Sequence, residues 1–365
     1  MNKSSESGNE IPAQIQEQVQ KTNEEVVRIY ELKNKSYQML TQMLPVMDQM
    51  MGYFTKTLTE EIAEALIKNA KEINRYLEMG YFGKELLSEE KCETINAKWK
   101  EDGNIQEAQQ ELGKILADMR EHMVLAREQA EEQRHTCCCC NQRNFFLPLT
   151  RYYDLMQEYY GGVPWKHETQ NNEEMVCPVC GSFDRERLIV LALDREDLSR
   201  KKILQFAPSN AVDNFLKDRE NAGYDTCDLF MEGVSYQADI QNLDMIEEKA
   251  YDIWICSHVL EHVKDDRKAM QELYRITKPN GYGLILVPLD LHQKETEEEW
   301  EASIEERWRR FGQDDHVRKY AKYDFIKRLE ASGFKVEELD IDTFGKDIFQ
   351  CNALSDTSVL YKVKR

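Results

Sequence analysis

Two pairs of cysteines have the residue type and the spacing to bind a metal ion. Cys137 and Cys140 form one C-x-x-C pair, and Cys177 and Cys180 form a second pair further along the chain. Each short loop can aim two thiolates at one ion, and four thiolates suit tetrahedral Zn²⁺ at Zn–S distances of about 2.3 Å. An ion with only protein ligands stabilises a small fold and takes no part in chemistry. The sequence therefore predicts a structural zinc ion in a zinc-ribbon-like segment.

The sequence does not decide which two cysteines of the first group bind the ion, because Cys138 and Cys139 lie between Cys137 and Cys140. A redox or catalytic thiol is the alternative, although nothing marks any one of these cysteines as an activated nucleophile. The chain holds 10 cysteines in 365 residues, and tight clusters suit reduced thiols or metal ligands better than a disulfide framework. We therefore expect a cytoplasmic protein.

The stretch QDDHVR contains the best candidate for proton transfer. The imidazole of His316 titrates near neutrality, and Asp314 or Asp315 could orient the ring. Arg318 could then hold an anionic group of a substrate. The alternative is a surface helix start that an aspartate caps. We predict His316 as a general base and Arg318 as its catalytic neighbour.

Two further carboxylates could bind a nucleotide. Asp228 lies near the end of the run YDTCDL, about twenty residues after an earlier turn. Nucleotide-binding α/β folds place an acid there that accepts hydrogen bonds from ribose hydroxyls. Asp239, in QADIQNL, could accept from an adenine amino group while Ile240 packs on the ring. The alternative for Asp228 is an exposed loop carboxylate.

The elements that must position these residues follow a β-α-β pattern after Lys202. Strand-like runs cover 202–206, 224–229, 251–257 and 282–288, with helix-like stretches between them, which is typical of a parallel sheet. Right-handed crossovers place the carboxyl ends of such strands at one edge, where ligands bind.

The stretch from Tyr251 to Leu289 reads as a buried strand, the loop SHVLEHV, a helix, a Lys-Pro-Asn-Gly turn and another buried strand. It resembles the type 11 class I S-adenosylmethionine-dependent methyltransferases. The chain looks closest to a bacterial subgroup with CPVCGS ahead of the domain, an Ala-Pro turn in place of the usual glycines and an FGQxDHVR element. These motifs stand here as CPVCGSFDRERL at 177–188, FAPSN at 206–210 and FGQDDHVRKY at 311–320. The resemblance covers roughly Cys137 to the C-terminus.

This resemblance implies an α/β, Rossmann-like domain with a seven-stranded sheet, helices on both faces and S-adenosylmethionine as cofactor. The final strands would include 336–339 and 358–363. Ser209 stands where the subgroup usually has Glu. For the loop with Glu261, a metal site on His258 and His262 is the alternative to packing. The residues expected to contact the cofactor are Phe206, Ala207, Pro208, Ser209, Asp228, Asp239, Ile240, Ser257 and His258.

The expected reaction is methyl transfer to a small-molecule acceptor. The resemblance to the bacterial subgroup implies that this acceptor is a sugar or surface-glycan precursor. The alternative is a catalytically weak or inactive methyltransferase-fold scaffold that works through its N-terminal helices. The missing glycines favour the scaffold. Asp228, Asp239 and the FGQDDHVR element favour the enzyme.

The first 135 residues have the apolar periodicity of amphipathic helices. One seam could form a coiled coil that makes a homo-oligomer or docks a partner, or it could pack within an intramolecular helical hairpin. The residues of this seam are Val26, Ile29, Leu40, Met43, Met47, Met50 and Phe54.

Composition limits the partners and the domain count. The formal net charge of -20 makes nucleic acid an unlikely partner, because phosphate backbones bind to clustered Lys and Arg. No apolar stretch is long enough for a membrane span. We expect a helical region at 1–135, a zinc-binding segment with a connecting helix at 136–200 and the methyltransferase domain at 201–365.

Overall fold

The computed structural model describes residues 12–54, 68, 105–163 and 165–365. The chain divides into two compact units. One comprises the start of the chain up to Asn23 together with His135–Arg365, and the other comprises Glu24–Arg134. No described helix has both the length and the apolar character that a membrane crossing requires.

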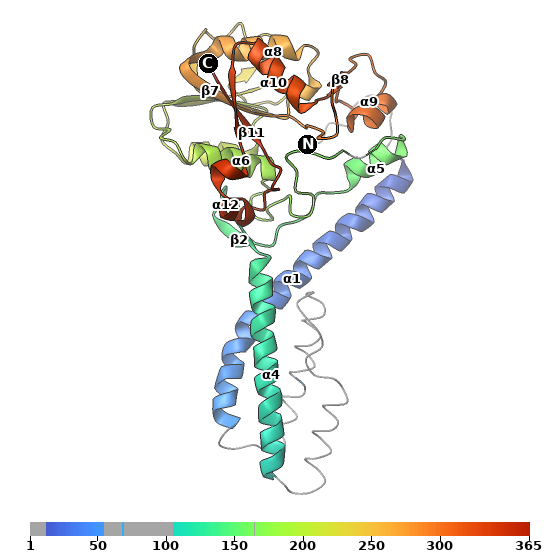
Figure 1. Cartoon of the computed structure of the whole chain (residues 1–365), viewed down its shortest axis with the longest axis vertical. Coiled ribbons are helices and arrows are strands. Elements are labelled where there is room, and N and C mark those ends of the chain that lie inside the picture. Colours follow the sequence, from blue (N-terminus) through green and yellow to red (C-terminus); the bar gives the residue numbers. More distant parts are fainter. Residues whose placement is uncertain (1–11, 55–67, 69–104, 164) are drawn as a thin grey trace. The chain divides into compact units, whose positions relative to one another are not determined.

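The larger unit is built on a seven-stranded sheet in the order β10-β11-β7-β6-β3-β4-β5. Strands β7, β6, β3, β4 and β5 are parallel, and β11 is antiparallel to both of its neighbours. The predicted seven-stranded, mostly parallel sheet is confirmed (Figure 1). Its strands are β3 Lys202–Phe206, β4 Gly223–Asp228, β5 Tyr236–Gln237, β6 Tyr251–Ser257, β7 Thr277–Leu286, β10 Lys335–Leu339 and β11 Leu360–Lys364.

Helices cover both faces of this sheet because its central strands are apolar on both sides. Leu204, Trp254 and Ile285 face a core that includes side chains of α8 and α10. Ile203 and Ile253 face the opposite core, which includes side chains of α6, α7 and α12. The helices are α6 Asp184–Leu193, α7 Asn210–Lys217, α8 Asp266–Ile276, α10 Lys322–Ala331, α11 Ile341–Phe344 and α12 Lys346–Cys351.

The segment SHVLEHV lies between β6 and α8, where the sequence predicted a loop. Its centre forms only the 3-10 turn η1, Leu260–His262. Helix α8 begins at Asp266, where the Asp265 carboxylate accepts a hydrogen bond from the backbone N–H of Lys268 at 3.0 Å. The side chains of this segment are therefore placed by a tight turn after β6 and not by a helix face.

The cysteine-rich segment packs against the same unit. A short hairpin, β1 His135–Cys137 and β2 Gln142–Asn144, precedes α5 Tyr152–Tyr159. The completely buried guanidinium of Arg187, on α6, donates to the carbonyls of Met175 and Ser182 at 2.9 Å and to that of Asn352 at 2.7 Å. Arg187 thus connects the cysteine segment, α6 and the chain after α12.

Two short elements follow β7. The two-residue strands β8 Glu297–Glu298 and β9 Arg318–Lys319 pair antiparallel, and α9 Ile304–Phe311 lies between them in the chain. Ser303 caps α9, since its hydroxyl accepts from the backbone N–H of Glu306 at 3.3 Å. Trp308 on this helix is buried against Ile15 of the first turns of α1.

The smaller unit contains most of α1 Ala13–Phe54 together with α4 Ile105–Glu132. Leu40 and Met47 of the predicted seam are buried, while the side chains of Met50 and Phe54 lie outside the described residues. Lys33 donates to Gln133 at 3.1 Å, and the two helices also carry an Asp48–Arg120 ion pair. The described residues therefore show α1 packing on α4 within one chain.

Candidate active site

Strained backbone marks the edge where the parallel strands end. Ala207 directly follows β3 with φ 44°, and His258 directly follows β6 with φ 55°. Such left-handed conformations cost about 1–3 kcal/mol in residues other than glycine and persist where the surroundings enforce them, often at functional sites. Ala207 N–H donates to the Cys227 carbonyl and His258 N–H to the Leu286 carbonyl, each at 2.9 Å. The neighbouring strands therefore hold both turns in place.

Two hydroxyls at this edge are buried and have no hydrogen-bond partner among the described residues. They are the Oγ atoms of Ser209 and Ser257, which follow β3 and end β6. Ser209 occupies the N-cap position of α7, yet its side chain accepts no capping hydrogen bond there. A buried hydroxyl without a partner costs about 1–3 kcal/mol, so both positions fit contacts to a bound ligand.

Asp228 ends β4 at the same edge, as predicted. Its Oδ1 accepts hydrogen bonds from the backbone N–H groups of Phe230 and Met231, both at 2.7 Å. These two bonds fix the carboxylate. No hydrogen bond to its Oδ2 is found in the described part of the chain, so this atom can accept from a ligand hydroxyl.

Asp239 follows β5, where its carboxylate accepts from the backbone and side chain of Gln241 at 2.8 and 3.0 Å. Its neighbour is placed differently from the prediction. Ile240 is 4% exposed and packs in the core beneath the sheet edge, as does Phe206 at 3%. The predicted packing of Ile240 on the adenine ring is corrected, because the turn after β5 directs this side chain into the core. The Phe206 side chain, at the end of β3, points into the same core and not to the predicted cofactor contact.

Glu261 and histidines form a cluster directly after β6. Glu261 is completely buried, and its Oε1 lies 3.4 Å from His258 Nδ1 and 3.8 Å from His262 Nε2. Burial alone would raise the pKa of Glu261, but His258 and the charges of His262 and His316 outweigh burial and hold the pKa at about 2. Burial would likewise lower the pKa of His262, but the Asp315 carboxylate and Glu261 raise it to about 9.

The structure brings His316 into this cluster and not to an open surface. Its imidazole is 3% exposed, and Nδ1 lies 3.0 Å from the Phe311 carbonyl oxygen. The prediction that an adjacent acid orients this ring is wrong, because Asp315 contacts His262 Nδ1 at 3.3 Å. Burial first of all, and then the charge of His262, lower the pKa of His316 to about 4. A buried ring is poorly placed to take a proton from an acceptor.

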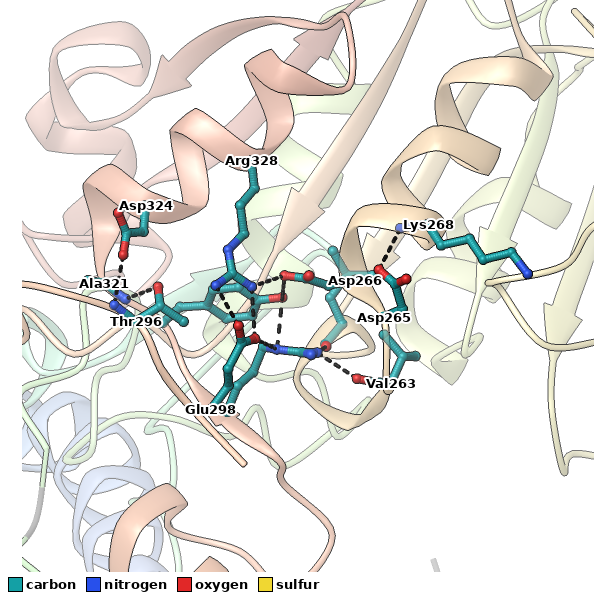
Figure 2. A network of polar contacts seen from close by, with 12 residues as sticks. Val263, Asp265, Asp266, Lys268, Thr296, Glu298, Ala321, Asp324 and Arg328 are labelled. Carbon is teal, nitrogen blue, oxygen red and sulfur yellow. Dashed lines mark hydrogen bonds and ion pairs between the residues drawn. The ribbon is translucent and has the colours of Figure 1, made fainter. Parts of the chain in front are cut away.

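The predicted substrate contact of Arg318 is also corrected, because its guanidinium donates hydrogen bonds to groups of the protein itself. Nη1 donates to the carbonyls of Leu260 and Val263 at 2.5 and 2.7 Å, and Nε donates to Glu298 at 3.1 Å. Figure 2 shows the adjoining network, in which Arg328 lies between Asp266 and Glu298. Arg318 therefore fixes the turn after β6, and no substrate contact is assigned to it.

Sequence reasoning did not find two residues that reach this edge from the segment ahead of the domain. His167 pairs through its backbone with Asp290, and burial together with nearby His258 lowers its pKa to about 4. The buried Nε1 of Trp165 has no hydrogen-bond partner within the described ranges. No spacing signal marks either residue, since tertiary packing alone brings them to the edge.

The predicted zinc ligands come together in a separate cluster. The ligand atoms of Cys137, Cys140, Cys177 and Cys180 all lie within 4.8 Å of one another. The Sγ separations are 3.6 Å for Cys137 and Cys180 and 3.8 Å for Cys140 and Cys177. Four sulfurs at about 2.3 Å from one zinc ion lie about 3.8 Å apart, so the arrangement fits a tetrahedral ion.

The structure also separates the four consecutive cysteines. Cys137 and Cys140 belong to the cluster, whereas the Cys138 thiol donates to the Arg187 carbonyl at 3.3 Å. Cys139 is not part of the four-thiol group that could hold an ion. The β1–β2 hairpin thus decides which of the four consecutive cysteines belong to the cluster.

Comparisons with known proteins agree with the architecture. The model of the family described as "Methyltransferase domain" matches residues 175–339. No curated protein matches this chain. Three bacterial structures show a distant likeness to this chain. They are a methyltransferase from Mesorhizobium loti (11% identity, 49% of this chain and 98% of that one, TM-score 0.38), YcgJ from Bacillus subtilis (16%, 48% and 95%, 0.31) and a methyltransferase from Aquifex aeolicus (15%, 47% and 86%, 0.30).

The family match begins inside the cysteine segment and ends at the last residue of β10. It therefore includes β3, β4, β6 and the turns that carry the strained and unsatisfied groups described above. Residues 175–339 are therefore similar to the methyltransferase domains that this family model describes.

Proposed function

We propose that this domain transfers the methyl group of S-adenosylmethionine to a small-molecule acceptor at the carboxyl edge of the sheet. The observation that carries the proposal is the pair of buried hydroxyls of Ser209 and Ser257, which have no partner among the described residues. They flank the two left-handed turns at Ala207 and His258. This edge is where open α/β sheets bind ligands.

Each cofactor-contacting residue has a distinct task in this proposal. Asp228 accepts hydrogen bonds from the ribose hydroxyls, since backbone N–H groups already orient its carboxylate. Asp239 accepts from the adenine amino group. The turn at Ala207 and Pro208 lets the backbone approach the amino-acid end of the cofactor. There the N-terminus of α7 binds the cofactor carboxylate, and the Ser209 hydroxyl accepts from the cofactor amino group.

S-adenosylmethionine supplies an electrophilic methyl group when it is bound. Catalysis then rests on positioning, because an in-line displacement needs the acceptor atom held opposite the leaving sulfur. In this proposal the acceptor side of the site is bordered by His167, which lies near His258, and by Trp165, whose ring centroid is 5.4 Å from that of His167. The resemblance to the bacterial subgroup makes a sugar or surface-glycan precursor the acceptor class that we propose.

Calorimetric titration of the full chain with S-adenosylmethionine tests this proposal without knowledge of the acceptor. We expect one saturable binding event per chain. A chain that binds neither S-adenosylmethionine nor the product S-adenosylhomocysteine would be a methyltransferase-fold scaffold, which is the alternative that the missing glycines raised.

We also propose that Cys137, Cys140, Cys177 and Cys180 hold one structural zinc ion. The sulfur separations fit the ion, and the closed set of four ligands leaves no position for a substrate. The ion would stabilise the hairpin that Arg187 connects to the catalytic unit. Elemental analysis of the purified protein should find zinc, and Cys177→Ser should remove one equivalent. Protein that contains no metal would reject this site.

A further inference from the structure

Two groups of described side chains are arranged so that each could hold a metal ion. One is the cysteine cluster. The other consists of Glu261, His262 and His316, whose ligand atoms all lie within 4.8 Å of one another. Glu261 and His262 lie in the turn η1 after β6, and the proposed methyl transfer leaves this group unexplained.

The buried carboxylate of Glu261 receives no hydrogen bond from the described residues. Its side chain is 0% exposed, and neither Oε1 nor Oε2 has a hydrogen-bond partner among the described residues. The contacts to His258 and His262 at 3.4 and 3.8 Å are ion-pair distances only. A buried carboxylate without hydrogen bonds is costly even beside charged histidines, so a cation bound between these groups would stabilise the turn.

Both imidazoles present one ring nitrogen to the carboxylate and use the other for support. His316 Nδ1 lies 3.0 Å from the Phe311 carbonyl, and His262 Nδ1 lies 3.3 Å from the Asp315 carboxylate. Metal-bound histidines almost always have such a carbonyl or carboxylate on the second nitrogen. The Nε2 atoms therefore remain as ligands.

The backbone holds these parts in register. Val317 N–H donates to the Glu261 carbonyl at 2.9 Å, which joins the chain after His316 to the turn η1. The two imidazole rings meet edge to face with centroids 4.7 Å apart. Because the side chains of His258 and His262 are 27% and 33% exposed, an ion could enter from solvent.

We propose that Glu261, His262 and His316 bind a divalent first-row transition-metal cation. Two imidazoles and one carboxylate suit such ions and leave coordination positions open. His258, at the edge of the cluster, is a further ligand candidate. The use of the ion in catalysis, as a Lewis acid on an acceptor oxygen, rests on the proposed function, whereas binding of the ion does not.

Co²⁺ is the probe, because its absorption spectrum separates the two sites. The full chain, with its cysteine site filled and loosely bound metal removed, is titrated with Co²⁺. We expect one further equivalent with visible ligand-field bands and no thiolate charge-transfer band. Glu261→Gln and His316→Ala should each weaken this binding by at least about 100-fold. The loss of a metal ligand lowers the affinity more than the loss of a group that only hydrogen-bonds a ligand.

Two variants guard against a folding artefact. Asp315→Asn changes an exposed outer-shell group and should weaken Co²⁺ binding by about 10- to 100-fold. His292→Gln removes an exposed histidine outside the cluster and should leave binding unchanged. A wild-type chain with no saturable Co²⁺ binding outside the cysteines, or equal binding in all four variants, would overturn the proposal. Cofactor calorimetry on the same samples reports separately on the proposed function.

Discussion

At the residue scale, one edge of the sheet combines left-handed backbone with buried polar atoms that lack hydrogen bonds. Ala207 and His258 have left-handed backbone, and Ser209, Ser257 and Glu261 carry buried polar atoms without hydrogen-bond partners in the described chain. Each departure costs free energy. Such costs gather at functional sites, where a ligand offsets them.

The turn at Ala207 gives a prediction about stability. Glycine adopts φ 44° without the steric cost that a Cβ brings, although glycine loses more chain entropy on folding. Ala207→Gly should therefore raise the free energy of unfolding by about 0.5–1 kcal/mol in a urea titration. Cofactor affinity should stay within a few-fold.

Ala331→Gly is the matched control, because Ala331 is exposed at the end of α10 in right-handed conformation. That change should lower the free energy of unfolding by about 0.5–1 kcal/mol. A loss of stability at both positions would show that the turn at Ala207 is not strained.

The sequence located two candidate carboxylates at the edge of the sheet because spacing alone decides their place. Asp228 ends β4, and Asp239 follows β5 closely. The side chains of Phe206 and Ile240 could not be assigned in this way, since the end of β3 and the turn after β5 direct them into the core. The surroundings of His316 come from the distant turn at Glu261, which no local pattern reveals.

At the element scale, the short strands β8 and β9 are held by charge more than by apolar burial. Glu298 on β8 accepts from Arg318 on β9 and from Arg328 on α10, as Figure 2 shows for Arg328. Arg328 also donates to Asp266 at 2.7 Å, where the Tyr320 hydroxyl donates as well. This network joins the FGQDDHVR element to the start of α8.

Removal of one partner from this network should be costly. Arg328 is 7% exposed and Asp266 is 2% exposed, so Arg328→Ala would leave a buried carboxylate without its guanidinium. We expect the free energy of unfolding to fall by about 3–5 kcal/mol in urea titrations. Lys364→Ala breaks an exposed pair with Glu337 and should cost about 0–1 kcal/mol. Equal effects would mean that the buried network does not stabilise this unit.

The long apolar strands were predictable because burial on both faces leaves a continuous apolar run, as in YDIWICS of β6. The two-residue strands β8 and β9 were not, since their residues are charged and pair only through tertiary contacts. The segment SHVLEHV was predicted as a loop, but its 3-10 turn was not predicted. A tight turn there is fixed by Arg318, far away in the sequence.

At the scale of the whole molecule, most of the N-terminal helical region forms a second compact unit, Glu24–Arg134. Its described helices bury Leu40, Leu44 and Met47, and they leave Val27 and Leu125 49% exposed. The packing of α1 on α4 corresponds to the hairpin alternative. A homo-oligomer formed through the remaining apolar surface stays a prediction, as does placement in the cytoplasm.

Light scattering tests the prediction for the oligomer. A chain that starts at residue 136 should have fewer subunits than the full chain, because it lacks the exposed apolar side chains of the helices. Truncation also removes Ile15 from its contact with Trp308, so Ile15→Ser in the full chain serves as the control for that loss. An unchanged subunit count after truncation would contradict a role of this region in assembly.

The central claim is that the carboxyl edge of the sheet binds S-adenosylmethionine through Asp228. Calorimetry on wild type, Asp228→Ala and Glu232→Ala tests it most directly, since Glu232 is an exposed carboxylate in the same loop. The account predicts that Asp228→Ala weakens binding by about 1–3 kcal/mol, the scale for hydroxyls left without a partner, while Glu232→Ala leaves it unchanged. Equal affinity of wild type and Asp228→Ala would contradict the account.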